Sequence, residues 1–228
     1  MNNTELDSVG DICRSRKELY DFLAYYFLNV PTKANLKKIY KQKGLLRELA
    51  DDETLFPDNY QSMKLDTHVQ EYYDRFFVTS SSIYVPPFEY AIRNKQQSGE
   101  AVKYGMLNNN GSFHVQDCYQ AVGFNPNMLN MFKPLQAIKF PDHYAFEISF
   151  MAYLVSAEQI CFTENDPSKA YRWRLLQRQF IMEHLGQWIG DFATLAKEKK
   201  RGLYSDLLEV SVALIASDTD YLVTTMSH

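Results

Sequence analysis

A strongly apolar segment from Tyr144 to Ala157 constrains the fold of this chain more than any other feature. Its apolar residues are distributed all round a helix instead of along one stripe, so a helix formed here must be buried on every side. Glu147 interrupts the segment, which is also shorter than the roughly 18 residues that indicate a membrane span. We therefore expect a central helix of a soluble protein, enclosed by other helices.

Helical periodicity continues over most of the chain. Apolar residues recur at spacings of three and four in five further segments, at 17–28, 65–77, 113–122, 168–197 and 203–223. Pro31 ends the first of these, and Thr32 can cap a helix that follows. The most loop-like region is 99–111, which contains Asn108-Asn109-Asn110-Gly111. No repeated strand–helix–strand pattern occurs, so the predicted fold class is all-α.

The segment 126–141 is the best candidate for a connection between two parts of the chain. It follows Asn125 and includes Pro126, Asn127 and Pro141, which are residue types that favour turns. We therefore expect a bundle-like protein of two closely packed helical subdomains. The predicted division is an N-terminal subdomain at 1–125, a hinge at 126–141 and a C-terminal subdomain at 142–228.

Composition excludes several classes of protein. The 228 residues carry a formal net charge of −4, which lacks the basic footprint of a nucleic-acid binder. The three cysteines, Cys13, Cys118 and Cys161, are scattered without CxxC spacing, which favours free thiols in a reducing compartment. The N-terminus has no basic and apolar signal pattern. We expect a cytoplasmic protein with no nucleic-acid partner and no stable membrane insertion.

Two acids stand just after prolines at apparent helix starts. Glu89 follows Pro86-Pro87-Phe88, and Asp142 follows Pro141. The ordinary interpretation is an acid near the positive end of a helix dipole, worth about 0.3–1 kcal/mol. The alternative is a carboxylate beside an aromatic floor of Phe76, Phe77 and Phe88, as a binding surface requires. Taken singly, each acid is explained by helix-start chemistry.

Groups suited to catalysis or metal binding are sparse. His143 and Glu147 share a helical face and Glu183-His184 follows later, but no HExxH motif or doubled ExxH motif is present. His184 and Trp188 are four residues apart, which is typical of a packed core stripe. We interpret the three cysteines as small, buried hydrophobic residues. We therefore predict no catalytic residue, no metal site and no cofactor.

Four short motifs occur in order between residues 70 and 192. Tyr73-x-Arg75-Phe76-Phe77 is similar to Y-x-R-L-F, and Pro86-Pro87-Phe88-Glu89 to P-P-Y-E. Phe140-Pro141-Asp142-His143, continuing to Glu147, is similar to P-D-H-x-x-x-E, and 180–188 matches F-L-x-x-H-L-x-x-W more loosely. Together they resemble the TorD/DmsD/NarJ family of redox-enzyme maturation chaperones. A Y-x-x-x-G-F step at 119–124 also fits, whereas Tyr90 replaces the usual serine.

The resemblance implies a cytoplasmic chaperone and not an enzyme. Such a protein binds the N-terminal, twin-arginine-type leader of a molybdenum-containing oxidoreductase subunit and holds it for cofactor insertion and assembly. Its partners are that catalytic subunit and its leader, and its state is a monomer or a domain-swapped dimer. Carried onto this chain, the leader-binding residues are Tyr73, Phe76, Phe77, Pro86, Pro87, Phe88, Glu89, Asp142, His143 and Glu147.

Two other functions stay open on the sequence. One is a helical metal-dependent hydrolase that uses His143, Glu147, Glu183 and His184. The other is a non-catalytic helical scaffold in which the acids only stabilise helix starts.

Overall fold

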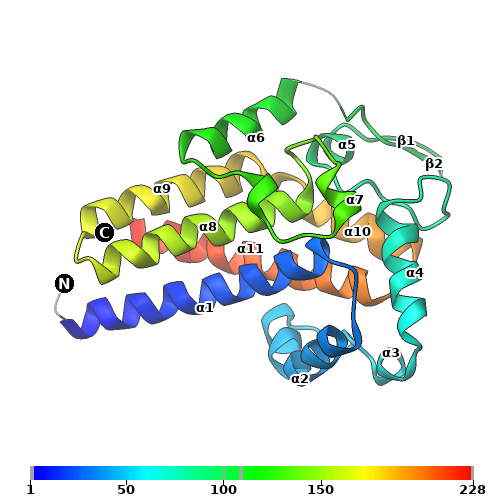
Figure 1. Cartoon of the computed structure of the whole chain (residues 1–228), viewed down its shortest axis with the longest axis horizontal. Helices are drawn as coiled ribbons and strands as arrows, with labels where there is room; N and C mark the ends of the chain where they lie inside the picture. Colours follow the sequence, from blue (N-terminus) through cyan, green and yellow to red (C-terminus); the bar gives the residue numbers. More distant parts are fainter. Residues whose placement is uncertain (1–2, 100, 108–109, 227–228) are drawn as a thin grey trace.

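The computed structural model describes residues 3–99, 101–107 and 110–226, and the chain is helical over most of this length (Figure 1). The helices are α1 (Asn3–Leu28), α2 (Lys33–Ala50), α3 (Asp58–Ser62), α4 (Leu65–Phe76), α5 (Glu89–Arg93), α6 (Asn110–Ala121), α7 (Lys133–Gln136), α8 (Tyr144–Thr163), α9 (Pro167–Glu183), α10 (Ile189–Lys199) and α11 (Leu203–Met226). Two 3-10 turns, η1 (Pro126–Met128) and η2 (Leu185–Gln187), and one antiparallel pair, β1 (Gln96–Ser98) with β2 (Ala101–Lys103), complete the described elements. The predicted all-α fold is confirmed.

Helix α8 is the centre of the molecule, as the sequence predicts. Helix α1 packs along it, and α9 returns beside it after the turn at 164–166 (Figure 1). Ile148, Met151 and Leu154 of α8 are wholly buried. Within the described ranges, α8 is the one helix long and apolar enough to cross a membrane, and 67% of that stretch lies inside the protein. Its apolar surface is therefore used for the core.

Local signals at the helix ends agree with the structure in several places. The Thr32 hydroxyl accepts the N–H of Asn35 at 3.3 Å and caps α2. Gly123 follows α6 with φ +75°, a left-handed conformation in which glycine carries no steric penalty. His143 caps α8, because its Nδ1 accepts the N–H of Ala145 at 3.1 Å.

The predicted helix over 168–197 is wrong in one respect, because the structure interrupts it. Helix α9 ends at Glu183, η2 follows, and α10 begins at Ile189. A Cβ on Gly186 would lie 2.7 Å from the carbonyl oxygen of Ile181, so the tight turn requires glycine. The interruption leaves His184 and Trp188 buried at the junction of α9 and α10.

One smaller expectation also changes. The loop-like region 99–111 contains strand β2 and the start of α6. As expected, a helix starts at Glu89, and Phe88 before it is extended with φ −128° and ψ 130°. The division into subdomains at 126–141 stays a prediction.

A buried polar network fastens α1 to the three long helices around it. Arg16 pairs with Asp218 of α11, with one contact at 3.0 Å, and with Glu158 of α8 at 3.1 Å. Gln177 of α9 donates to Glu158 at 2.9 Å, and the Tyr20 hydroxyl donates to Asp218 at 2.6 Å. These side chains are buried, so each charge depends on its partners for the hydrogen bonds that water would otherwise supply.

Arg16→Ala is expected to destabilise the fold strongly. The substitution leaves the carboxylates of Glu158 and Asp218 buried with one cation fewer, which costs about 3–5 kcal/mol of unfolding free energy. Urea denaturation followed by circular dichroism measures this value. Arg14→Ala is the control, because Arg14 pairs with Asp11 on the surface, and its effect should stay below about 1 kcal/mol. Equal effects of the two variants would contradict the prediction.

Candidate functional site

Two segments that are far apart in the chain meet through an isolated antiparallel bridge between Phe88 and His143. The Glu89 N–H donates to the carbonyl of Asp142 at 2.9 Å, and the Tyr144 N–H donates to the carbonyl of Pro87 at 2.9 Å. We call this contact the seam. It places the start of α5 against the start of α8. Asp142 does not lie in the first turn of α8, because it precedes the cap residue His143.

Asp142 lies wholly buried in the seam. Its Oδ2 accepts the N–H of Tyr90 at 3.2 Å, whereas Oδ1 has no hydrogen-bond partner. Burial, opposed by backbone hydrogen bonds and reinforced by the charge of Glu89, raises the pKa of Asp142 to about 6. The carboxyl is therefore poised to gain or lose a proton near neutral pH.

Glu147 lies one turn into α8 and is also wholly buried. The indole N–H of Trp188 donates to its Oε2 at 3.0 Å, and Oε1 has no partner. Burial and the neighbouring charge of Glu89 raise the pKa of Glu147 well above its ordinary value. Trp188 is therefore held beside α8 by this hydrogen bond as well as by its packing.

Glu89 is the best-paired carboxylate of the three. One oxygen pairs with the guanidinium of Arg93, and the other lies 2.9 Å from Nδ1 of His184. Glu89 is wholly buried, whereas 32% of the Arg93 side chain is exposed. Arg93 also donates to the carbonyl of Glu183 at 3.1 Å, which ties α5 to the end of α9. An arginine thus already reaches the site from the surface.

His143 completes the seam without carrying charge. Its Nε2 is buried and has no partner. Burial lowers its pKa to about 3, so the ring is neutral at physiological pH. Phe88 packs edge-on against both His143 and Phe140, with ring centroids 5.1 and 5.6 Å apart.

The predicted site residues thus fall into two groups. The seam brings together Pro87, Phe88, Glu89, Asp142, His143 and Glu147. Tyr73, Phe76 and Phe77 contact other rings: Phe76 packs on Phe27 and Tyr204, and Tyr73 and Phe77 pack on Phe132. Pro86 is buried, next to Val85 in the chain. Of the aromatic floor expected beside Glu89, only Phe88 therefore belongs to the seam, where its ring packs on Phe140 and His143.

Arg75, from the same motif as Tyr73, has a structural role. It is wholly buried and donates to the carbonyls of Ala196 at 2.7 Å and Lys200 at 2.6 Å. These acceptors lie at the end of α10, where helix carbonyls lack partners within the helix. Glu71 pairs with Arg75 at 3.1 Å. This motif therefore secures the end of α10 and does not present a free cation.

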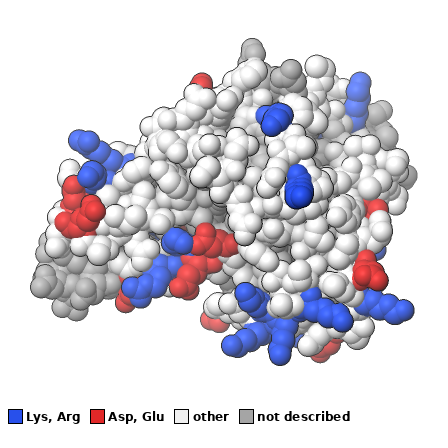
Figure 2. Space-filling view, viewed as in Figure 1, with Lys and Arg blue, Asp and Glu red and all other residues white. Residues whose placement is uncertain are grey.

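A cavity of about 570 Å³ opens beside the seam. Its wall comes from the end of α6, from the segment 123–141 and from the start of α8, and includes Tyr119, Phe124, Met131, Ile138, Phe140 and Phe146. The Tyr119 hydroxyl donates to the carbonyl of Pro141 at 3.0 Å, which joins the cavity to the seam. Among the residues that the structure describes, Lys139 is the one charged residue of the cavity lining. On the face shown in Figure 2, basic side chains gather over α2.

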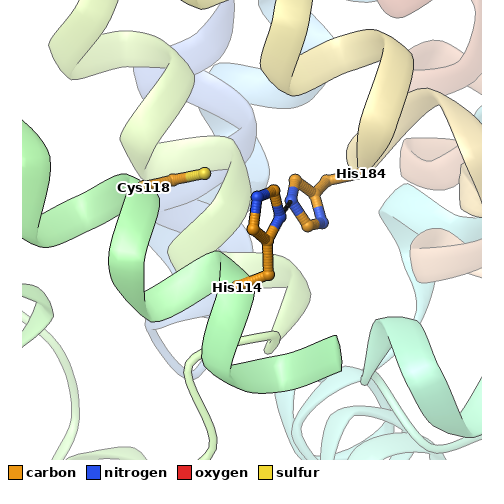
Figure 3. Close-up of side chains that lie close together, drawn as sticks. All are labelled: His114, Cys118 and His184. Atoms are coloured by element: carbon orange, nitrogen blue, oxygen red, sulfur yellow. Dashed lines mark hydrogen bonds between the residues drawn. The ribbon is translucent and has the colours of Figure 1, made fainter. Parts of the chain in front are cut away.

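Two further residues lie beside His184, the histidine that contacts Glu89, and the sequence motifs do not include them. His114 and Cys118 of α6 lie beside His184, and Figure 3 shows the two side chains projecting toward its ring. His114 and Cys118 are four residues apart, a spacing that places them on one helical face and could have been recognised in the sequence. Cys118 is half-buried, not a core residue. Of the ligands proposed for a metal-dependent hydrolase, only His184 belongs to this group.

Asp142→Asn is expected to change how stability depends on pH. Because the folded pKa of Asp142 is raised to about 6 from 3.8, the folded state binds this proton more tightly than the unfolded state does. Its stabilising contribution is full below pH 3.8 and is lost as the pH rises through 6. The stability of the variant relative to wild type should therefore rise by about 3 kcal/mol between pH 4 and pH 7.

Urea titrations of both proteins at each pH measure this difference. The lowered pKa of His143 makes both proteins less stable as the pH falls. Because this contribution is common to both, it cancels in the difference between the unfolding free energies of variant and wild type. A difference that stays constant from pH 4 to pH 7 would contradict the buried, protonatable state of Asp142.

Comparison with protein families agrees with the motifs. The model of the nitrate reductase delta subunit family matches residues 45–194, which is well over half of the chain and includes both sides of the seam. No curated protein matches the chain. The chain therefore belongs to the nitrate reductase delta subunit family, a family of chaperones for the maturation of molybdenum-containing oxidoreductases.

Proposed function

We propose that this chain is a cytoplasmic chaperone that binds the N-terminal, twin-arginine-type leader of a molybdenum-containing oxidoreductase subunit and holds it for cofactor insertion and assembly. The observation that carries the proposal is the cluster of Glu89, Asp142 and Glu147 at the seam, where an arginine of the chain itself already pairs with Glu89. Carboxylates bind guanidinium groups through strong, charge-assisted hydrogen bonds. No bond needs to break, so the function requires no nucleophile.

The leader arginine is proposed to replace Arg93 on Glu89. The three carboxyls are wholly buried, so a peptide cannot reach them from solvent while the seam is closed. Arg93 is the exposed end of this cluster and marks the path by which a guanidinium reaches Glu89. A second arginine would meet Asp142, whose Oδ1 has an unused acceptor position, once the seam separates. At Glu89 the exchange substitutes one ion pair for another, and at Asp142 the arginine supplies the cation that this carboxyl lacks in the closed seam.

The apolar part of the leader is proposed to occupy the cavity beside the seam. Phe124, Met131, Ile138 and Phe140 supply an apolar lining. Part of that lining belongs to 126–141, the segment proposed to act as a hinge between the two subdomains. Movement of this segment would widen the cavity and strain the seam at Pro141. The same movement would permit the domain-swapped dimer that the family resemblance implies.

Glu89→Gln combined with Asp142→Asn is expected to weaken leader binding by about 2 kcal/mol or more, roughly 30-fold, because the peptide loses its charged acceptors. Calorimetry with a synthetic peptide of two arginines followed by an apolar segment measures the dissociation constant. Both substitutions keep the side-chain shape, so a folded variant is expected. Glu53→Gln, an exposed carboxylate paired with Arg47, is the control and should bind like wild type. Unchanged affinity in the double variant would refute the proposed site.

Arg93→Gln is expected to strengthen leader binding by up to roughly tenfold, because the peptide arginine no longer has to displace an internal competitor. The same calorimetric titration measures this change, and a peptide with both arginines replaced by glutamine should lose the gain. Weaker binding to the Arg93→Gln variant would mean that Arg93 supports the bound peptide and does not compete with it.

The scaffold hypothesis makes the opposite prediction for cells. If Glu89 only stabilised a helix start, Glu89→Gln would leave maturation of the client oxidoreductase unchanged. Under the chaperone proposal, the activity of the client falls while the level of the variant protein stays normal. Client activity and immunoblotting in the same cultures separate the two accounts.

A further inference from the structure

His114, Cys118 and His184 form a group that the leader-binding proposal does not use. Within residues 3–99, 101–107 and 110–226, this is the one group of three or more potential metal ligands, and its ligand atoms lie within 4.8 Å of one another. Two of the side chains come from successive turns of α6, and the third comes from the break between α9 and η2 (Figure 3). From these observations we infer that the group is a binding site for Zn²⁺.

The donor atoms suit this ion. Zn²⁺ is bound in proteins by thiolate sulfur and imidazole nitrogen, usually in tetrahedral geometry with bonds of about 2.0–2.3 Å. Those bonds place neighbouring ligand atoms about 3.3–3.8 Å apart. His184 Nε2 and His114 Nδ1 now lie 2.7 Å apart, so these two must separate slightly while the sulfur closes in. His114 is exposed near the start of α6, where a ring rotation meets little resistance.

The ring of His184 is already oriented for a metal. Its Nδ1 faces Oε2 of Glu89 at 2.9 Å, so the proton lies on Nδ1 and the lone pair of Nε2 points toward His114. A carboxylate that holds the far nitrogen of a ligating histidine is a recurrent feature of zinc sites, because it fixes the tautomer and raises the basicity of the ring. Glu89 is wholly buried and keeps this orientation without competition from water.

A cavity of about 260 Å³ lies beside His114 and Cys118. Its lining includes His114, Asp117, Cys118 and Glu183. Three protein ligands with an open fourth position leave room for water or for a donor atom of a bound peptide.

Isothermal titration of the untagged, chelator-treated protein with Zn²⁺ tests the site. One ion per chain is expected, with binding weakened at least roughly a hundredfold in Cys118→Ser and in His114→Gln. Glu89→Gln should weaken binding by about 10–100-fold, since it removes the group that orients His184. Cys161→Ser is the matched control, because Cys161 is a free cysteine outside the group, and it should bind like wild type.

Co²⁺ provides a readout that does not depend on whether the variants fold. The wild-type protein loaded with Co²⁺ should show a thiolate-to-cobalt charge-transfer band, and alkylation of Cys118 beforehand should abolish it. Binding of less than one Zn²⁺ per chain, a Co²⁺ spectrum without the thiolate band, or equal affinity in Cys118→Ser would each overturn the inference. None of these results depends on leader binding.

Discussion

The antiparallel bridge between Phe88 and His143 is the contact on which the candidate site depends. Two backbone hydrogen bonds hold the segments together, so that α5 packs against the start of α8. Glu89 and Asp142 are both buried at this contact. Each such bond contributes only about 0.5–1.5 kcal/mol net, and no further strand extends the pair. Burial of Phe88 and Tyr144 on the two sides of the seam adds to these bonds. Under the leader-binding proposal, the peptide must offset both contributions to open the seam.

The charges at the seam explain why a cation would favour opening. Asp142 and Glu147 have raised pKa values because they are buried next to Glu89. Glu89 alone has two partners, Arg93 and His184. The cluster thus contains more carboxyl groups than cations, and it tolerates this excess by holding protons. An arginine that entered would replace a proton with a better-matched partner and would lower the pKa of the acid it met.

The extent to which the sequence predicts this protein differs between fold and site. Helical periodicity is local, so the all-α class and the central position of α8 follow from it directly. The break in the helix at 184–188 does not follow from periodicity. It depends on the close approach of Gly186 to the carbonyl of Ile181, which is a tertiary contact and leaves no periodic pattern in the sequence. The meeting of Glu89 with Asp142 is a pairing across 53 positions, and only the family resemblance suggested it. The pair of His114 and Cys118 was readable from its helical spacing.

Helix α6 contributes to both the cavity beside the seam and the inferred Zn²⁺ site. Tyr119, one residue after Cys118, lines the cavity beside the seam, and its hydroxyl binds the carbonyl of Pro141. At the other end of the helix, Gly111 lies so close to the ring of Tyr90 that a Cβ there would fall 1.9 Å from it. A helix of this length moves as a unit, so a cation that drew His114 and Cys118 toward His184 would also reposition the cavity wall. Binding of a cation and binding of a peptide must then influence each other by equal free energies, because such coupling is reciprocal.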